Sequence, residues 1–366
     1  MNLVPQGVKP IRGPGRRDGL GTLSSVPEPT AVDDLPGWLA RAGVAEGRGL
    51  EIGPLHAPRL PKASFAVEYV DHATTEELRQ KYADDGEMAD RLHEIVEVDH
   101  VWNGDEPLVV VVGQESAYDF VFASHVVEHA PDMIGWLREI AAVLVDGGKL
   151  CLAIPDKRLC FDVNRNLTEM SDLVEAHLRG LKSPSYRQIY DFHSKIVAVD
   201  AGALWAGTVD YSGTWRDDLD PDGWALELCL KHHATGEYVD GHCQVFTPTS
   251  FLDLYRRLVA LDLVEYSIAE FVPTVTNTIE FQVVLEKLPG SLDAAERRRI
   301  QLASIPTFVD PVPSFGTAVL PEDELPADAV AMTVSHQEER LILLKRRAMQ
   351  AARKVAKRLP AIAPRS

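Results

Sequence analysis

The stretch GLEIGPL, residues 49–55, decides how the rest of the chain is interpreted. It is an apolar run that closes on an acid, Glu51, and then reaches Gly53 and Pro54. A strand that ends in a glycine turn early in an α/β chain is the usual place for a nucleotide-like ligand. Prolines at 58 and 61 interrupt the helix expected next. By itself the motif is equally compatible with a plain strand-to-loop turn.

A second stretch supports the ligand-binding interpretation: YDFVFASHVVEHAPDMIGWLREIAAVLVDGGKLCLAIPD, residues 118–156. Residues 118–123 are apolar on both faces, as a central parallel strand should be. Pro131 then begins a helix, which Gly147 and Gly148 are expected to end. The next strand is expected at 150–154. Residues at helical spacing predict the buried stripe of the helix, namely Ile134, Leu137, Ile140, Ala141 and Leu144.

Two further strands are expected between these stretches, each ending near an acid. The first, 65–70, ends at Asp71, which lies 20 residues after Glu51 and suits a grip on ribose hydroxyls. The alternative for Asp71 is a cap on the helix that follows, a task that Thr74 and Thr75 can also perform. The second strand, 95–98, ends at Asp99. The type of the apolar run 108–112 is left open because it is too short for periodicity to decide.

The remainder of the chain predicts how the sheet closes. Residues 159–240 are irregular, and after them we expect a helix at 251–261 and strands at 264–271 and 279–286. The segment 159–240 is therefore interpreted as an insertion at the carboxyl edge of the sheet, where it would build a substrate pocket. We expect a flexible arm over 1–34, a catalytic domain over 35–287, and a proline-rich segment with a basic helix over 288–366.

Composition narrows the class of protein. The 366 residues are 45% hydrophobic and 25% charged, which is ordinary for a globular protein. A net charge of -18 argues against binding of nucleic acid, which needs clustered Lys and Arg. None of the four cysteines has CxxC spacing, which argues against a zinc site of that type and indicates a reducing compartment. Since no signal peptide or run of ~20 apolar residues is found, we expect a cytoplasmic protein.

These motifs resemble the class I S-adenosylmethionine-dependent methyltransferases over roughly residues 48–287. The resemblance rests on five sequence segments: LEIGP, SHVVEH, the glycine pair at 147–148, IPDKR and HCQVFTP. The resemblance implies an α/β fold with a Rossmann-like seven-stranded sheet whose last strand is antiparallel. The chain departs from the family at its first motif, where only Glu51 and Gly53 of the acid–glycine pattern remain.

The resemblance also implies the cofactor, S-adenosylmethionine, and a set of contacts. Its expected site has Glu51, Gly53 and Pro54 below the methionine part, Asp71 at the ribose and Asp99 near the adenine. Ser124 and His125 are expected to contact it as well. Within this family the chain resembles bacterial methyltransferase-domain proteins linked to glycan assembly, so we expect O-methylation of a carbohydrate or glycosylated metabolite. A natural-product methyltransferase acting on another small molecule, or a non-catalytic cofactor-binding scaffold, stays open.

Transfer to a hydroxyl needs a base, and His129, Asp156 and His242 are the candidates. Each has a structural alternative, such as a hydrogen bond to the backbone. Asp156, His242 and Asp240 could share a divalent ion, but their spacing is not diagnostic and no metal is predicted. The basic helix at 337–359 could pack on protein, including a second copy of the chain, or contact an anionic membrane. Packing on protein is preferred because the apolar seam is narrow.

Overall fold

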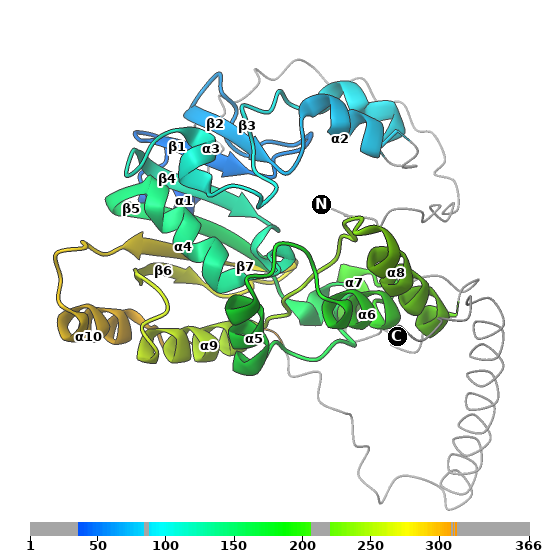
Figure 1. The fold of residues 1–366 in the computed structure, drawn as a ribbon. Helices are drawn as coiled ribbons and strands as arrows, with labels where there is room; N and C mark the ends of the chain where they lie inside the picture. The colour runs from blue at the N-terminus through cyan, green and yellow to red at the C-terminus, as the bar shows by residue number, and fades with distance from the viewer. Residues whose placement is uncertain (1–35, 84–87, 206–219, 309, 311, 313–366) are drawn as a thin grey trace, which may run out of the picture. The chain divides into compact units, whose positions relative to one another are not determined.

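A seven-stranded sheet organises the computed structural model, with strand order β3-β2-β1-β4-β5-β7-β6 (Figure 1). The structure describes residues 36–83, 88–205, 220–308, 310 and 312. All strand pairs are parallel except those of β7, which is antiparallel to both neighbours. The strands are β1 Arg48–Ile52, β2 Ala66–Asp71, β3 His100–Val101, β4 Tyr118–Ser124, β5 Leu144–Pro155, β6 Tyr266–Val272 and β7 Glu280–Lys287. The predicted Rossmann-like sheet is thus confirmed.

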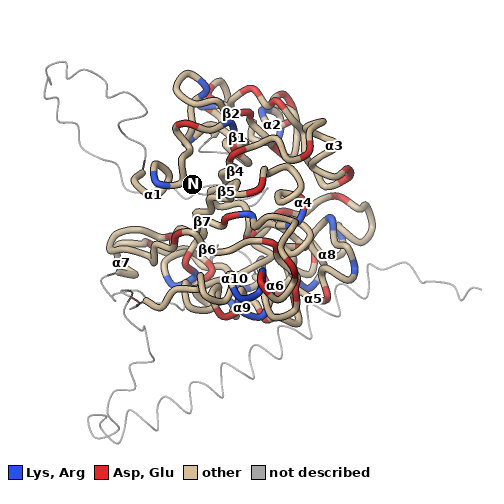
Figure 2. The backbone as a smooth tube through the Cα atoms, turned by 90° about the vertical axis from the view of Figure 1, so that its left-hand side faces the viewer, with Lys and Arg blue, Asp and Glu red and all other residues tan. Residues whose placement is uncertain are grey.

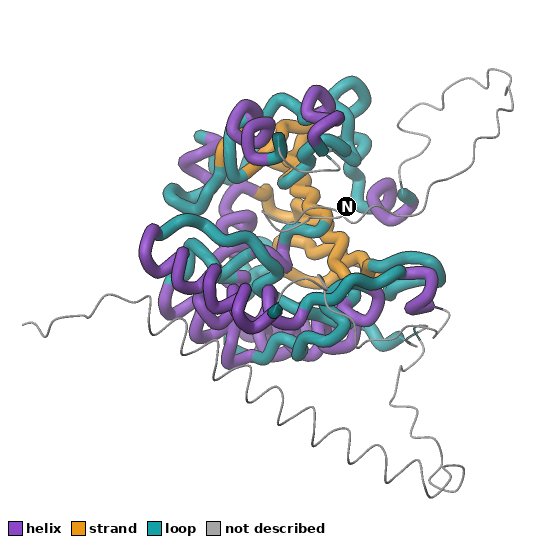
Figure 3. The backbone as a smooth tube through the Cα atoms, turned by 90° about the vertical axis from the view of Figure 1, so that its right-hand side faces the viewer, coloured by secondary structure: helices purple, strands orange, loops and turns teal. Residues whose placement is uncertain are grey.

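Both faces of the central strands are covered, and Figure 3 shows the strands enclosed by helices and loops. Side chains of β4 alternate between two cores, because successive residues of a strand point to opposite faces. Val121 packs in the core formed by α3 (Leu108–Val112), α4 (Met133–Val143) and α9 (Pro248–Ala260). Phe120 packs in the other core, beside α1 (Gly37–Arg41). A Cβ at Gly49 would lie 2.2 Å from the Phe120 ring, so β1 requires glycine there.

Helix α4 begins at Met133, two residues after the predicted start at Pro131, and it ends earlier than predicted. The Asp132 side chain caps it by accepting the Gly135 N–H, and the predicted stripe is buried. The helix stops at Val143, so the prediction that the glycine pair ends it is wrong. Leu144 already pairs with β4, and the pairing then jumps to Lys149. The excursion between them contains Gly147, whose φ of +81° favours glycine.

The third strand is the main correction to the expected fold. Residues 95–98 are not a strand; β3 is His100–Val101, preceded by a 3-10 helix, Ala89–Glu94. The Asp99 carboxylate accepts the Tyr69 N–H at 2.6 Å, so a side chain takes the place that a ladder carbonyl would fill. The undecided run at 108–112 is helical, as α3.

The segment 159–240 contains helices α5 Met170–Arg179, α6 Tyr186–Lys195, α7 Ala201–Trp205 and α8 Pro221–Thr235. In Figure 1, α6 and α8 lie side by side beyond the strand ends. Helix α9 and strands β6 and β7 then close the sheet close to their predicted positions. Helix α10, Ala294–Ser304, was not predicted; Asp293 caps it by accepting the Glu296 N–H.

Two remaining expectations concern the outer parts of the chain. The arm at 1–34 and the basic helix at 337–359 lie outside the described residues. Within the described part, no helix combines the length and apolar character needed to cross a membrane. Figure 2 shows acidic and basic residues interspersed along the described backbone.

Candidate active site

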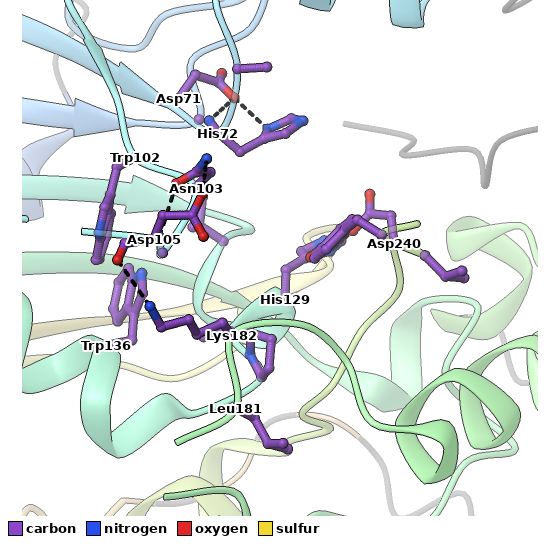
Figure 4. Close-up of a pocket in the computed structure, with 18 of the residues that line it drawn as sticks. Asp71, His72, Trp102, Asn103, Asp105, His129, Trp136, Leu181, Lys182 and Asp240 are labelled. Atoms are coloured by element: carbon purple, nitrogen blue, oxygen red, sulfur yellow. Dashed lines mark hydrogen bonds and ion pairs between the residues drawn. The ribbon is translucent and has the colours of Figure 1, made fainter. Parts of the chain in front are cut away.

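A cavity of about 1560 Å³ lies at the carboxyl ends of β1, β2 and β4. This exceeds the roughly 300–1,000 Å³ of a typical ligand pocket, so it has room for two ligands. Its walls come from the ends of β1 and β2, the loops after β3 and β4, helices α2 (Thr75–Lys81) and α4, and the segment 159–240. In Figure 4, Asp71 and His72 lie at the top, Trp102 and Trp136 at the left, His129 and Asp240 at the right, and Leu181 and Lys182 below.

The turn after β1 places Gly53 on the cavity wall but turns Glu51 away from it. Gly53 has a φ of +69°, and a Cβ there would lie 3.0 Å from Val126 Cγ2. Glu51 is buried and accepts the N–H groups of Arg59 and Leu60 at 2.7 and 3.0 Å. Burial raises the pKa of Glu51 to about 7, although those two hydrogen bonds oppose the rise. Glu51 therefore holds the loop that replaces the expected helix; neither it nor Pro54 lines the cavity.

Asp71 lies on the cavity wall at the end of β2 and is 6% exposed. Its Oδ1 accepts the His72 N–H at 2.8 Å. The alternative role, a cap on α2 (Thr75–Lys81), is excluded because Thr74 forms a complete capping box with Glu77. Asp71 is thus available to a ligand in the cavity.

Asp99 is placed outside the cavity wall. Its carboxylate binds Lys62 Nζ at 2.5 Å as well as the Tyr69 N–H. The wall is instead formed by the turn after the true β3, which runs from Trp102 to Pro107. The Trp102 ring stacks on Trp136 of α4, with centroids 6.5 Å apart. The polar turn Trp-Asn-Gly-Asp at 102–105 was a usable signal, but the misplaced third strand hid it.

After β4 the chain makes a strained turn at His125, a non-glycine residue with a φ of +55°. His125 lines the cavity, and its Nε2 lies 2.7 Å from Glu280 Oε2 on β7. Ser124 ends β4 without lining the cavity. Of the two residues expected to contact the cofactor here, the structure brings only His125 to the wall.

His129 is the catalytic candidate that reaches the cavity. Its Nδ1 hydrogen-bonds Asp240 Oδ1 at 3.0 Å, and its Nε2 is buried without a hydrogen-bond partner. Burial lowers the pKa of His129, but the charge and hydrogen bond of Asp240 outweigh burial and raise it above its usual value. Burial also opposes ionisation of Asp240, yet His129 holds the pKa of that carboxyl well below its usual range.

The other two candidates lie behind the wall. Asp156 is fully buried and binds Arg158 at 2.6 Å and the Thr274 hydroxyl at 2.9 Å. The possibility that Asp156 shares an ion with His242 and Asp240 receives no support, because its carboxylate is already paired. His242 is buried against His129, with ring centroids 4.7 Å apart at 82°.

The segment 159–240 supplies the lower and right-hand walls. Lys182 Nζ donates to the Asp105 carbonyl at 3.0 Å, which joins this segment to the turn after β3. Trp224 lines the cavity, whereas Trp205 instead donates its Nε1–H to the Thr278 carbonyl at 2.8 Å. Trp215 lies outside the described residues. Further lining residues here are Leu181, His193, Glu227, Leu228, Lys231, Glu237, Tyr238 and Val239.

A family model described as a methyltransferase domain matches residues 34–193. This match and the sheet show where the similarity lies: residues 34–193 are similar to a methyltransferase domain. The cofactor expected for such a domain is S-adenosylmethionine. The site fits the cofactor, since Gly53 gives a close backbone approach and Asp71 offers a carboxylate at the second strand end.

Solved structures similar to the chain include methyltransferases from several organisms. A putative sarcosine dimethylglycine methyltransferase from Galdieria sulphuraria is 20% identical over 34% of this chain and 44% of that one, with a TM-score of 0.24. A SAM-dependent methyltransferase from Methanosarcina mazei is 15% identical over 69% of this chain and 98% of that one, with a TM-score of 0.34. One from Mesorhizobium loti is 13% identical over 70% and 95%, with a TM-score of 0.34.

The chain spans about half the length of several structures it matches: 44% of the Galdieria protein and 50% of the carbon methyltransferases CurJ and DszA. No curated protein sequence matches the chain.

Proposed function

We propose that the enzyme transfers a methyl group to a hydroxyl oxygen of a carbohydrate or glycosylated metabolite. The observation that carries this proposal is the character of the wall formed by 159–240. There, the aromatic rings of Trp224 and Tyr238 line the cavity together with charged groups, namely Lys182, Glu227, Lys231, Glu237 and Asp240. Aromatic surface with several hydrogen-bonding groups suits a polyhydroxylated ligand better than an apolar one.

The two sides of the cavity bind different reactants. Asp71 and Gly53 at the strand ends bind the cofactor, and the wall opposite binds the acceptor. Bound S-adenosylmethionine supplies an electrophilic methyl group, which an acceptor oxygen takes up as the carbon–sulfur bond breaks and its electrons stay on sulfur. Holding the two reactants in line can lower the barrier by ~7–11 kcal/mol without any covalent enzyme intermediate.

The hydroxyl proton has to leave during this transfer. His129 lies on the wall like His125, and like it has one nitrogen held by a carboxylate; its partner, Asp240, belongs to the acceptor side of the cavity. With Nδ1–H donated to Asp240, Nε2 carries the lone pair, and the raised pKa of His129 favours uptake of a proton there. His129 with Asp240 is thus the first candidate for the base.

The proposal includes a cytoplasmic location, which the four free and buried cysteine thiols support. The partner surface predicted at 337–359 remains a prediction, since that helix lies outside the described residues.

The test uses the full chain with S-adenosylmethionine and a panel of nucleotide sugars, glycosides and non-glycosylated phenols. We expect release of S-adenosylhomocysteine with sugar-containing acceptors, and an O-methyl signal by NMR on a sugar oxygen. Turnover restricted to non-glycosylated acceptors would favour a natural-product methyltransferase. Cofactor binding by calorimetry without turnover on either class would favour the non-catalytic scaffold.

A further inference from the structure

Three side chains from two distant parts of the chain converge at the cavity wall: His129 lines the cavity, and Glu128 and His242 lie behind it. Glu128 and His129 lie in the 3-10 helix Val127–His129, and His242 follows the segment 159–240. One donor atom from each lies within 4.8 Å of the other two. The backbone fixes this meeting, because the Glu128 carbonyl accepts the N–H groups of Cys243 and Gln244 at 2.7 and 2.9 Å.

Among the described residues, three buried atoms of this group have no hydrogen-bond partner: both carboxylate oxygens of Glu128 and Nε2 of His129. Glu128 is fully buried, and neither of its carboxylate oxygens accepts a hydrogen bond from the part of the chain that the structure describes. The nitrogens paired with its Oε1 are farther away, His125 Nδ1 at 3.7 Å and His242 Nε2 at 3.9 Å. His129 Nε2 is likewise buried and unpartnered. Buried polar atoms are nearly always satisfied, so three such atoms in one group indicate a missing ligand.

Each imidazole is oriented from behind by a carboxylate. His129 Nδ1 is 3.0 Å from Asp240 Oδ1, and His242 Nδ1 is 2.5 Å from Asp162 Oδ2. Asp162 is itself held by the buried Arg165 at 2.8 Å. When Nδ1 donates to a carboxylate, Nε2 is left with its lone pair, and this carboxylate–histidine arrangement is the usual support of a metal-binding histidine.

We propose that Glu128, His129 Nε2 and His242 Nε2 bind one divalent transition-metal cation. Two imidazoles and one carboxylate suit Zn²⁺, Mn²⁺, Fe²⁺ or Co²⁺ better than Mg²⁺, which prefers oxygen ligands. Ligand atoms at about 2.0–2.2 Å from a shared ion lie roughly 3.5 Å apart, so the group needs only a small closure. The cation supplies the buried carboxylate with its missing counter-charge.

Cation binding does not depend on the identity of the acceptor. A cation on Nε2 competes with a proton for His129, so its affinity falls as the pH falls. With the cation bound, the cation would act as a Lewis acid and would take over from His129 the role of making the acceptor oxygen nucleophilic. This last role alone rests on the proposed function.

The experiment titrates Zn²⁺, Mn²⁺ and Mg²⁺ by calorimetry into untagged full-length protein that has been stripped with a chelator, in the absence of any acceptor. Elemental analysis and the absorption spectrum of the Co²⁺ form report the stoichiometry and the ligand type. We expect one transition ion per chain, with Mg²⁺ bound at least about tenfold more weakly. The variants Glu128→Gln and His242→Asn are expected to lose at least about tenfold in affinity.

His193→Asn is the matched control. His193 is also buried near Asp240 and has an unpartnered Nδ1, but it lies outside the group. Its variant should bind the cation like the wild type. Glu128→Gln removes an unpaired buried charge, so circular dichroism should show it folded, and its loss of affinity then reports on the ligand. No binding to the wild type, or equal affinity in all three variants, would overturn the site. A failure of methyl transfer with cation binding intact would overturn only the proposed function.

Discussion

Asp71 Oδ1 lies 2.7 Å from His72 Nδ1, so one edge of this carboxylate is held by its own neighbour in the chain. The pairing fixes the orientation of the Asp71 side chain at the end of β2 before any ligand arrives. A ligand that hydrogen-bonds the carboxylate then meets a group that has already lost its rotational freedom.

Replacement of Asp71 should weaken cofactor binding. Asp71→Ala removes charge-assisted hydrogen bonds to the cofactor and should lower its affinity by at least ~1 kcal/mol, measured by calorimetry with S-adenosylmethionine. Asp99→Asn is the comparison, because Asp99 lies off the wall and pairs with Lys62. Unchanged affinity in Asp71→Ala, or an equal loss in Asp99→Asn, would remove Asp71 from the ribose position.

Gly53→Ala should reduce both stability and cofactor affinity. A Cβ there has an unfavourable φ and meets Val126 Cγ2 at 3.0 Å. We expect a loss of about 1–3 kcal/mol in the free energy of unfolding. Gly113→Ala has nearly the same φ, +67°, with nothing within 4 Å of its Cβ and no place on the wall. The Gly113→Ala variant should lose stability but keep its cofactor affinity. If the two variants bind the cofactor equally well, the cofactor does not approach the backbone closely at Gly53.

Glu51 should make the protein less stable as the pH rises from 4.5 to 7. Burial raises its pKa from 4.5 to about 7, so within this window the native state holds a proton that the unfolded state has released. The free energy of unfolding therefore falls with pH, by up to roughly 3 kcal/mol from this group.

Glu51→Gln should remove that slope. Urea denaturation at pH 5 and pH 7.5 would measure it, and the wild type should lose more stability between these values than the variant. Since one amide nitrogen would face a backbone N–H, the variant should also lose about 1–3 kcal/mol at pH 5. Parallel pH profiles for the two proteins would show that Glu51 is ionised throughout.

Asp156→Asn tests whether this acid belongs to the chemistry or to the scaffold. Its carboxylate pairs with Arg158 in the interior, so we expect a loss of about 3–5 kcal/mol of stability. The cofactor affinity of the folded fraction should stay unchanged. A folded variant of normal stability that has lost turnover would restore Asp156 as a catalytic group.

Trp224→Ala should raise the KM for the acceptor without changing cofactor affinity, because Trp224 comes from the wall opposite the strand ends. Trp205→Phe is the matched control, since it loses only a hydrogen bond to Thr278 outside the cavity. Steady-state kinetics with the best acceptor from the panel would compare them. A weaker cofactor affinity in Trp224→Ala would move this residue to the cofactor side.

Hydrophobic pattern and turn chemistry were enough to predict most of the sheet, because β1, β2, β4 and the closing strands are apolar runs between clear turns. The same two signals did not predict β3, which has only two residues. They also did not predict α10, which is marked in the sequence by the pair Asp293 and Glu296 beside a proline-rich stretch. In both places a local side chain, Asp99 or Asp293, settled the structure.

Site residues were predictable where the backbone alone places them. Gly53, Asp71, His125 and His129 follow strand ends and lie on the wall. Glu51, Asp99 and Asp156 are also near strand ends, but backbone N–H groups or an arginine hold their carboxylates elsewhere. Which way a side chain turns depends on partners from distant segments, so the sequence pattern could not reveal it.

The way in which the two ends of the segment 159–240 are joined affects how the sequence of such an enzyme can diverge. Thr168 donates its N–H to the Val245 carbonyl, and Arg165 binds the His242 carbonyl, so the two ends of the segment are fastened to each other. A closed excursion of this kind tolerates insertions and substitutions between its ends at little entropic cost. Acceptor preference can therefore diverge in close relatives while the binding of the methyl donor is inherited unaltered.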